Sequence, residues 1–277
     1  MQDESKNIIL ILIVLALFTG ATIELSEGST TIGIVLFIIA AGVISRIKLT
    51  GDNAAFRSSK TYLFAGIFIM AAVSTYNLAT RDNIGTLDSM TFIIGASLFA
   101  MGTSKKDLRQ LGEFGLYISA VFTVLYLIFY SFFGHFNIDF LHLFDHYFVL
   151  MPTVVALKVV GIPVEIVAIE TITLYGEEAM TIVIGGPCSG LYSMFLLIGI
   201  VAGYSRIERM ELRRSLLILL FAISIAYLAN LARVFILYLT AYFYGLDTMS
   251  VVHTHLGWII FAGTAGIIMY LMNMKRK

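Results

Sequence analysis

The sequence is poor in charge, in proline and in cysteine. Of its 277 residues, 13% are charged, 3 are proline and 1 is cysteine. A single cysteine excludes an internal disulfide framework. Charged residues make up about a quarter of an ordinary soluble domain, so this composition excludes that class. The formal net charge is zero, which gives no reason to expect nucleic acid as a partner.

Apolar residues take the place of the missing charge. They make up 59% of the chain, and the mean hydropathy is +0.92. Several apolar runs reach roughly 17 to 25 residues, the length that a helix needs to cross about 30 Å of hydrocarbon. We therefore expect an all-α polytopic membrane protein with about eight transmembrane helices. The predicted spans are 7–24, 29–45, 61–79, 86–102, 113–133, 190–204, 215–240 and 255–272.

The spans divide the chain into two predicted regions. Four of them lie within residues 1–112, which we interpret as an N-terminal four-helix membrane region. Residues 113–277 form the second region, which holds the unusual polar residues. Within it, the run 146–160 is short and is interrupted by Pro152 and Lys158. We interpret this run as a helix that lies in the interface, or that dips into the membrane and returns.

A different pattern follows between residues 163 and 187. Residues 164–174 are rich in β-branched side chains, 175–178 read as a turn, and 180–184 resume the β-branched run. This pattern predicts a small β-hairpin. Open sheet edges cannot face lipid, so we expect the hairpin to lie outside the hydrocarbon. Four glutamates also favour water: Glu165, Glu170, Glu177 and Glu178.

The basic residues predict the orientation. Lys and Arg in short loops mark the cytoplasmic side. Fifteen of the 18 basic residues fall on one side if the chain has eight spans and 146–160 does not cross. They are Lys6 and those in 46–60, 103–112, 205–214 and 275–277. We therefore expect a multi-pass protein of the cytoplasmic membrane with both termini in the cytoplasm and the hairpin outside.

Three chemically active residues reach the outer face in this topology. Cys188 begins an inward span and His253 begins the last one. Arg233 lies about 19 residues beyond Arg214, hence roughly 28 Å up an outward helix. A thiol becomes a nucleophile at a helix N-terminus or beside a cation. The combination suits acyl transfer through a thioester, with an imidazole moving the proton.

Two neighbouring residues complete the candidate site. His255 is an alternative to His253 as the acid and base, and the two point about 200° apart on a helix. Asn230 lies one turn before Arg233 and is expected to hold the imidazole or the guanidinium in place. We predict no metal and no cofactor for this chemistry.

Each of these residues also has an ordinary structural interpretation. A lone cysteine is usually a small buried apolar residue, Arg233 can extend its guanidinium to the outer headgroups, and histidines are common at span ends. A membrane metalloprotease would use His135, His142 and His146, yet no His-Glu-x-x-His motif is present. A transporter or channel without catalytic activity is the non-enzymatic alternative, and it would predict inverted repeats and broken helices near the midplane.

Three short blocks resemble those of the exosortase/archaeosortase family. They are Pro187-Cys188-Ser189-Gly190-Leu191, Ala229-Asn230-Leu231-Ala232-Arg233-Val234, and His253 four residues before Gly257-Trp258. The segment Leu-Lys-Val-Val-Gly-Ile-Pro-Val at 157–164 is also similar to that family. The resemblance covers roughly residues 145–262, whereas the first 110 residues match only in being hydrophobic.

The resemblance implies a multispanning cysteine protease and transpeptidase, convergent with soluble sortases. Its partners would be exported proteins whose C-terminal sorting signal combines a short motif, a transmembrane helix and a basic cluster. Cleavage would occur on the outer face, and the new carboxyl terminus would pass to an anchor such as a lipid headgroup. By position, Cys188 would be the nucleophile, Arg233 its cationic partner and His253 the acid and base.

Overall fold

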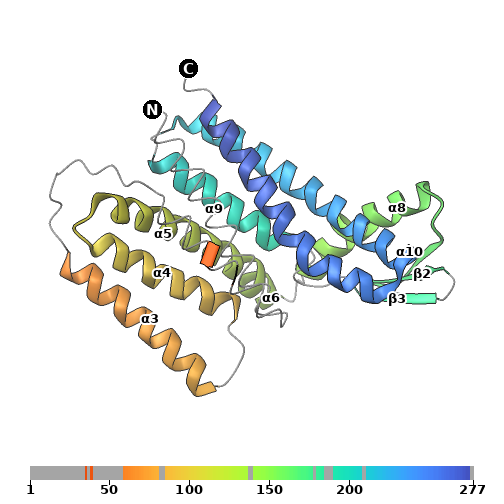
Figure 1. Cartoon of the computed structure of the whole chain (residues 1–277), viewed down its shortest axis with the longest axis horizontal. Helices are drawn as coiled ribbons and strands as arrows, with labels where there is room; N and C mark the ends of the chain where they lie inside the picture. Colours follow the sequence, from red (N-terminus) through yellow and green to blue (C-terminus); the bar gives the residue numbers. More distant parts are fainter. Residues whose placement is uncertain are drawn as a thin grey trace. The chain divides into compact units, whose positions relative to one another are not determined.

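The computed structural model describes residues 35, 38, 39, 59–80, 85–136, 140–176, 179–183, 190–207 and 210–274. These residues are mostly helical (Figure 1). Within this part of the chain, four helical segments are long and apolar enough to cross a membrane: Lys60–Thr80, Leu108–Phe132, Phe140–Val159 and Leu212–Ile268. Shorter apolar helices occupy Thr86–Gly102 and Leu191–Arg206. The first predicted span, 7–24, lies outside the described residues, and so does nearly all of 29–45. The count of eight spans stays a prediction.

The chain forms two compact units, and the one built from 49–132 and 194–221 is helical. It contains α3 (Lys60–Thr80), α4 (Thr86–Gly102) and α5 (Lys106–Tyr126), which continues as the π-helix η1 (Leu127–Phe132). Most of α9 (Leu191–Ile207) also belongs to it. Figure 1 shows α3, α4 and α5 side by side. The division into 1–112 and 113–277 stays a prediction.

Glycines allow the helices of this unit to approach closely. A β-carbon on Gly66 of α3 would lie 2.5 Å from the backbone nitrogen of Phe99 in α4, and one on Gly199 of α9 would lie 2.9 Å from Cα of Ile118 in α5. A β-carbon on Gly112 of α5 would likewise lie 2.5 Å from the carbonyl oxygen of Ser97 in α4. Helices in membranes pack through such small residues because lipid provides no hydrophobic force between them.

The second unit, built around 133–193 and 222–277, contains the only sheet among the described residues. Its strands are β1 (Val164–Ala168), β2 (Thr171–Tyr175) and β3 (Ala179–Val183), antiparallel in the order β1-β2-β3. β structure is therefore present where the sequence predicts it, and β2 and β3 pair across the predicted turn at 175–178. The sheet differs from a simple hairpin in having a third strand. The run 164–174 is divided by a turn at residues 169–170, where Ala168 already pairs with Thr171.

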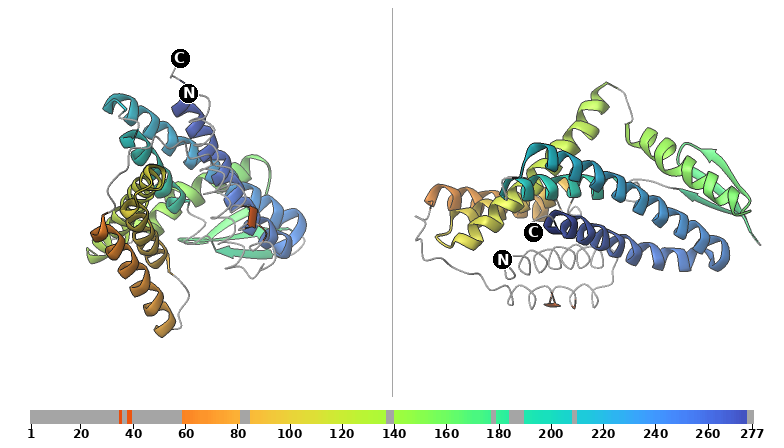
Figure 2. Two further views of the ribbon diagram at one scale, coloured as in Figure 1. Left: turned by 60° about the vertical axis from the view of Figure 1, so that its left-hand side comes forward. Right: turned by 90° about the horizontal axis from the view of Figure 1, so that it is seen from above.

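One face of the sheet packs on helices. The segment before the sheet comprises α6 (Phe133–His135), α7 (Phe140–Phe144), the π-helix η2 (Asp145–Leu150) and α8 (Met151–Val159). Leu157, Ile172 and Leu174 are fully buried, and they form one core with Val234 and Tyr238 of α10 (Leu212–Met274). Figure 2 shows the strands lying along α8. Burying such side chains contributes about 1.5–3 kcal/mol each.

The segment predicted to lie in the interface is a longer helix than its sequence suggests. Residues 140–159 are helical throughout, and by length and composition they form a candidate span. Pro152 follows directly on the π-helix η2 and has no N–H to donate to the carbonyl of Phe148. That carbonyl accepts a hydrogen bond from the Tyr227 hydroxyl instead (2.9 Å). Whether this segment crosses the membrane decides the orientation of everything that follows it.

The last two predicted spans are joined by a kink rather than by a loop. Residues 240–255, which separate the predicted spans 215–240 and 255–272, belong to α10, which has a single break at Gly245 (φ 83°, ψ 172°). Glycine adopts a positive φ without the penalty that a β-carbon brings. His253 therefore lies about two turns inside the second helical part, 246–274, and does not begin it.

Candidate active site

Gly190 and Asn230 bring the first two sequence blocks together. Gly190 immediately precedes α9 and has φ 75°. A β-carbon there would lie only 2.4 Å from Cγ of Asn230, whose side chain extends from α10 and is 7% exposed. No side chain fits at that separation, and few residues other than glycine tolerate that backbone conformation. The start of α9 therefore rests directly against the Asn230 amide.

Arg233 and Gly257 bring the second and third blocks together. A β-carbon on Gly257 would lie 3.6 Å from Nη1, 3.7 Å from Cζ and 3.9 Å from Nε of Arg233, so the guanidinium lies beside the backbone at Gly257. Arg233 is 7% exposed. A guanidinium is rarely kept out of water without a specific task. The two contacts place residues 190, 230, 233 and 257 at one locus within a single compact unit.

The two histidines of the third block face different sides of their helix. His253 is four residues before Gly257, and residues four apart share a helix face. His255 is two residues from both, so it points about 200° away. Both side chains are half-buried. The face of the helix that meets Arg233 is thus the face of His253, which is the residue that the sequence favours.

Cys188 lies outside the described residues. Its position in the sequence is two residues before Gly190. The remaining predicted site residues, Arg233, Asn230, His253 and His255, all lie in α10. Sequence reasoning did not assign a site role to Gly190 or Gly257. Gly190 belongs to the same short block as Cys188, and Gly257 to the same block as His253. A site role for the two glycines could have been proposed from this proximity.

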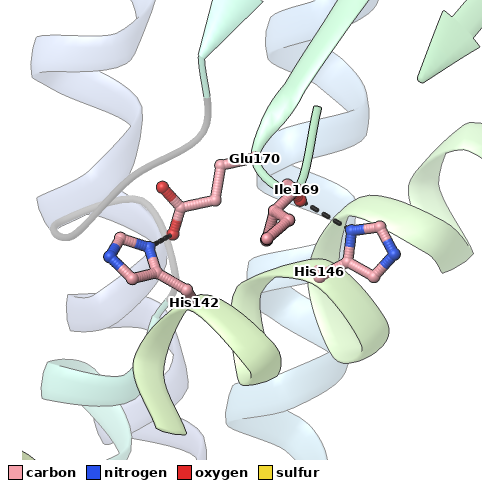
Figure 3. Close-up of polar contacts among 4 residues, drawn as sticks. All are labelled: His142, His146, Ile169 and Glu170. Carbon is pink, nitrogen blue, oxygen red and sulfur yellow. Dashed lines mark hydrogen bonds and ion pairs between the residues drawn. The ribbon is translucent and has the colours of Figure 1, made fainter. Parts of the chain in front are cut away.

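A separate polar cluster lies where α7 and η2 meet the turn between β1 and β2 (Figure 3). Nδ1 of His142 contacts Oε1 of Glu170, and Nδ1 of His146 lies 2.6 Å from the carbonyl oxygen of Ile169. Asp145, 1% exposed, is buried beside them. Among the described residues no group of three or more His, Cys, Asp and Glu side chains is arranged to hold a metal ion. The contacts of His142 and His146 attach the helix to the sheet.

The comparison with known families covers nearly the whole chain. A family model described as transmembrane exosortase matches residues 8–270. Neither a curated protein nor a solved structure matches the chain.

Proposed function

Because the chain belongs to the transmembrane exosortase family, we propose that it is a membrane-embedded cysteine peptidase and transpeptidase. Its substrates are exported proteins that carry a C-terminal sorting signal with a transmembrane helix. The observation that carries the proposal is a pair of contacts made by the part of α10 before Gly245. Asn230 lies against Gly190, and Arg233 lies against Gly257 in the part of α10 after Gly245. Residues from three blocks that are far apart in sequence thereby come together. One of them, Gly190, is two residues from Cys188, the only cysteine of the chain.

The chemistry follows from the residue types at this locus. Cys188 gives its proton to the imidazole of His253, and the thiolate adds to the carbonyl carbon of the scissile peptide bond. The negative charge that develops on the carbonyl oxygen is stabilised by Arg233. His253 passes its proton to the leaving nitrogen, the C–N bond breaks, and a thioester on Cys188 remains.

The second half of the reaction reverses the proton movements. Water or a lipid amine attacks the thioester carbonyl and gives a proton to His253, which returns it to the sulfur as the thioester bond breaks. Attack by water gives a cleaved protein, and attack by an amine gives an anchored one. Asn230 lies against Gly190 and acts as a positioning residue for the start of α9.

The proposed orientation places this chemistry outside the cell. The basic loops at 46–60, 103–112 and 205–214 and the tail at 275–277 are cytoplasmic, and the sheet and the Cys188 segment are extracytoplasmic. Substrates that have crossed the cytoplasmic membrane and are held by a C-terminal helix are then presented on the same side as the thiol.

The proposal predicts the behaviour of two variants. Cys188→Ala and Arg233→Ala should each abolish processing of exported proteins with a C-terminal signal, while the protein still inserts in normal amounts. Leu228→Ala, at a side chain that is 62% exposed on the same helix, is the matched control. Processing is followed by immunoblot of precursor and product in host cells. Full processing by either variant would refute the mechanism.

A further inference from the structure

β3 is an edge strand of the described sheet: it pairs with β2 on one side only. The strand order β1-β2-β3 gives β3 one hydrogen-bonding neighbour within the described part of the chain. Ile182 is buried, whereas Ala179, Thr181 and Val183 are exposed. The alternation means that one side of β3 belongs to the core while the other side chains lie on the open face of the sheet.

The register identifies the backbone groups that point to the open edge. The N–H of Tyr175 donates to the carbonyl of Pro163 (3.0 Å), so the backbone of Tyr175 faces β1. Successive residues of a strand face opposite neighbours, and Leu174 and Ile172 therefore bond to their β3 partners. Those partners are Met180 and Ile182.

The remaining residues of β3 present their backbone groups to the open edge. Ala179, Thr181 and Val183 each direct an N–H and a C=O away from β2. A side-chain contact agrees with this register, because Thr173 Oγ1 and Thr181 Oγ1 lie 3.2 Å apart, and side chains come closest in pairs that share no backbone bonds. β3 thus offers alternating donors and acceptors over five residues.

β3 lacks the devices that usually protect an edge. Proteins blunt edge strands with proline, charged side chains or bulges. The sequence Ala-Met-Thr-Ile-Val has no proline and no charge, and its pairing with β2 is uninterrupted. The other edge strand, β1, carries Glu165 and has a register shift between Ile166 and Ala168. β3 is therefore the better template for an added strand.

The sequence connects this edge to the proposed catalytic residue. Val183 is five residues before Cys188. Resting on the proposed function, we propose that the edge of β3 binds the extended segment of the sorting signal by strand addition. Main-chain hydrogen bonds hold the peptide beside residues 179–183 and direct it toward the thiol, while its alternate side chains provide the sequence preference. The proposed occupant is the segment next to the membrane helix of the signal, because the bond to be cleaved must reach Cys188, five residues beyond Val183.

A proline substitution tests the edge directly. The N–H of Thr181 is not used within the sheet, so Thr181→Pro leaves the ladder with β2 intact while it removes an outward donor and obstructs pairing. We expect precursor processing to slow at least tenfold in pulse-chase, whereas Thr181→Ala, which keeps the N–H, stays within twofold of the unchanged protein. Equal rates for the two variants would overturn the proposal.

Photo-crosslinking separates this proposal from the proposed function. Benzoylphenylalanine is placed at Val183 in Cys188→Ala protein, and at Val159, which is 81% exposed on α8, as the control. Strand addition predicts crosslinks from position 183 and none from position 159. The crosslinked residues should lie just before the transmembrane helix of an accumulated exported precursor. Crosslinks to a second copy of this chain, or none while the precursor accumulates, overturn it and leave the proposed function standing. Normal processing in Cys188→Ala cells overturns the proposed function itself.

Discussion

At the scale of single residues, two glycines beside α10 differ in the room that they leave. A β-carbon at Gly190 would lie 2.4 Å from Asn230 Cγ, and the backbone there has φ 75°. At Gly257 the nearest atom would be Arg233 Nη1 at 3.6 Å, which is an ordinary van der Waals separation. The first position therefore requires glycine, while the second accepts a methyl group.

The pair gives a matched prediction. Gly190→Ala should reduce processing at least tenfold, because the left-handed backbone costs about 1–2 kcal/mol for an alanine and the methyl group displaces Asn230. Gly257→Ala should stay within about threefold of the unchanged protein. Precursor and product are measured in cells with equal amounts of inserted protein. Equal tolerance at the two positions would contradict the account of the Gly190–Asn230 contact.

The polar residues of the candidate site are easier to single out from the sequence than its glycines. Arg233 inside an apolar run is conspicuous because a charge in a membrane helix is costly, and Asn230 follows from helix periodicity. The contacts of Gly190 and Gly257 depend on distances between helices, which no local pattern encodes. Asp145 was not predicted as a buried group, because its burial depends on the tertiary fold, which brings Glu170 near it.

At the scale of elements, helices in apolar runs are predictable and breaks between elements are less so. The β-branched run at 164–174 shows where a sheet forms, but nothing in its pattern marks the turn at 169–170 that adds a third strand. The break at Gly245, which places His253 inside the second helical part of α10 and not at its start, likewise has no marker in the hydrophobic pattern. The helix continues on both sides because residues such as Leu246 and Met249 remain good helix formers.

The close helix contacts of the helical unit show the same limit. Gly66, Gly112 and Gly199 are visible in the sequence, and small residues are typical of membrane helix interfaces. The helix that each one meets is fixed only by the tertiary fold. The presence of close packing could therefore be predicted from the sequence, whereas the partners could not.

At the scale of the whole molecule, the orientation depends on the segment 140–159. It is long and apolar enough to cross the membrane, but its buried side packs on the sheet, with Leu150 and Leu157 fully buried. We predict that it does not cross. The sheet is then extracytoplasmic, and the basic tail shares a side with the other basic loops.

Single-cysteine labelling checks this prediction. In Cys188→Ser protein, a cysteine at Thr181 should react with an impermeant maleimide applied from outside the membrane. Cysteines at Ser104 and Lys275 should react only after permeabilisation. If 140–159 crosses the membrane, the pattern changes: Thr181 becomes protected and Lys275 becomes reactive, while Ser104 stays protected.

The proposed mechanism requires Cys188 to form a covalent acyl intermediate with a sorting signal. The direct measurement is mass spectrometry of the trapped enzyme, isolated from membranes that contain an exported protein with a C-terminal signal. The account predicts a substrate fragment joined to Cys188 as a thioester, absent from Arg233→Ala protein, and the attached residue identifies the cleaved bond. An unmodified Cys188 that also resists alkylation from the outer side would contradict the account and favour a transporter without catalytic activity.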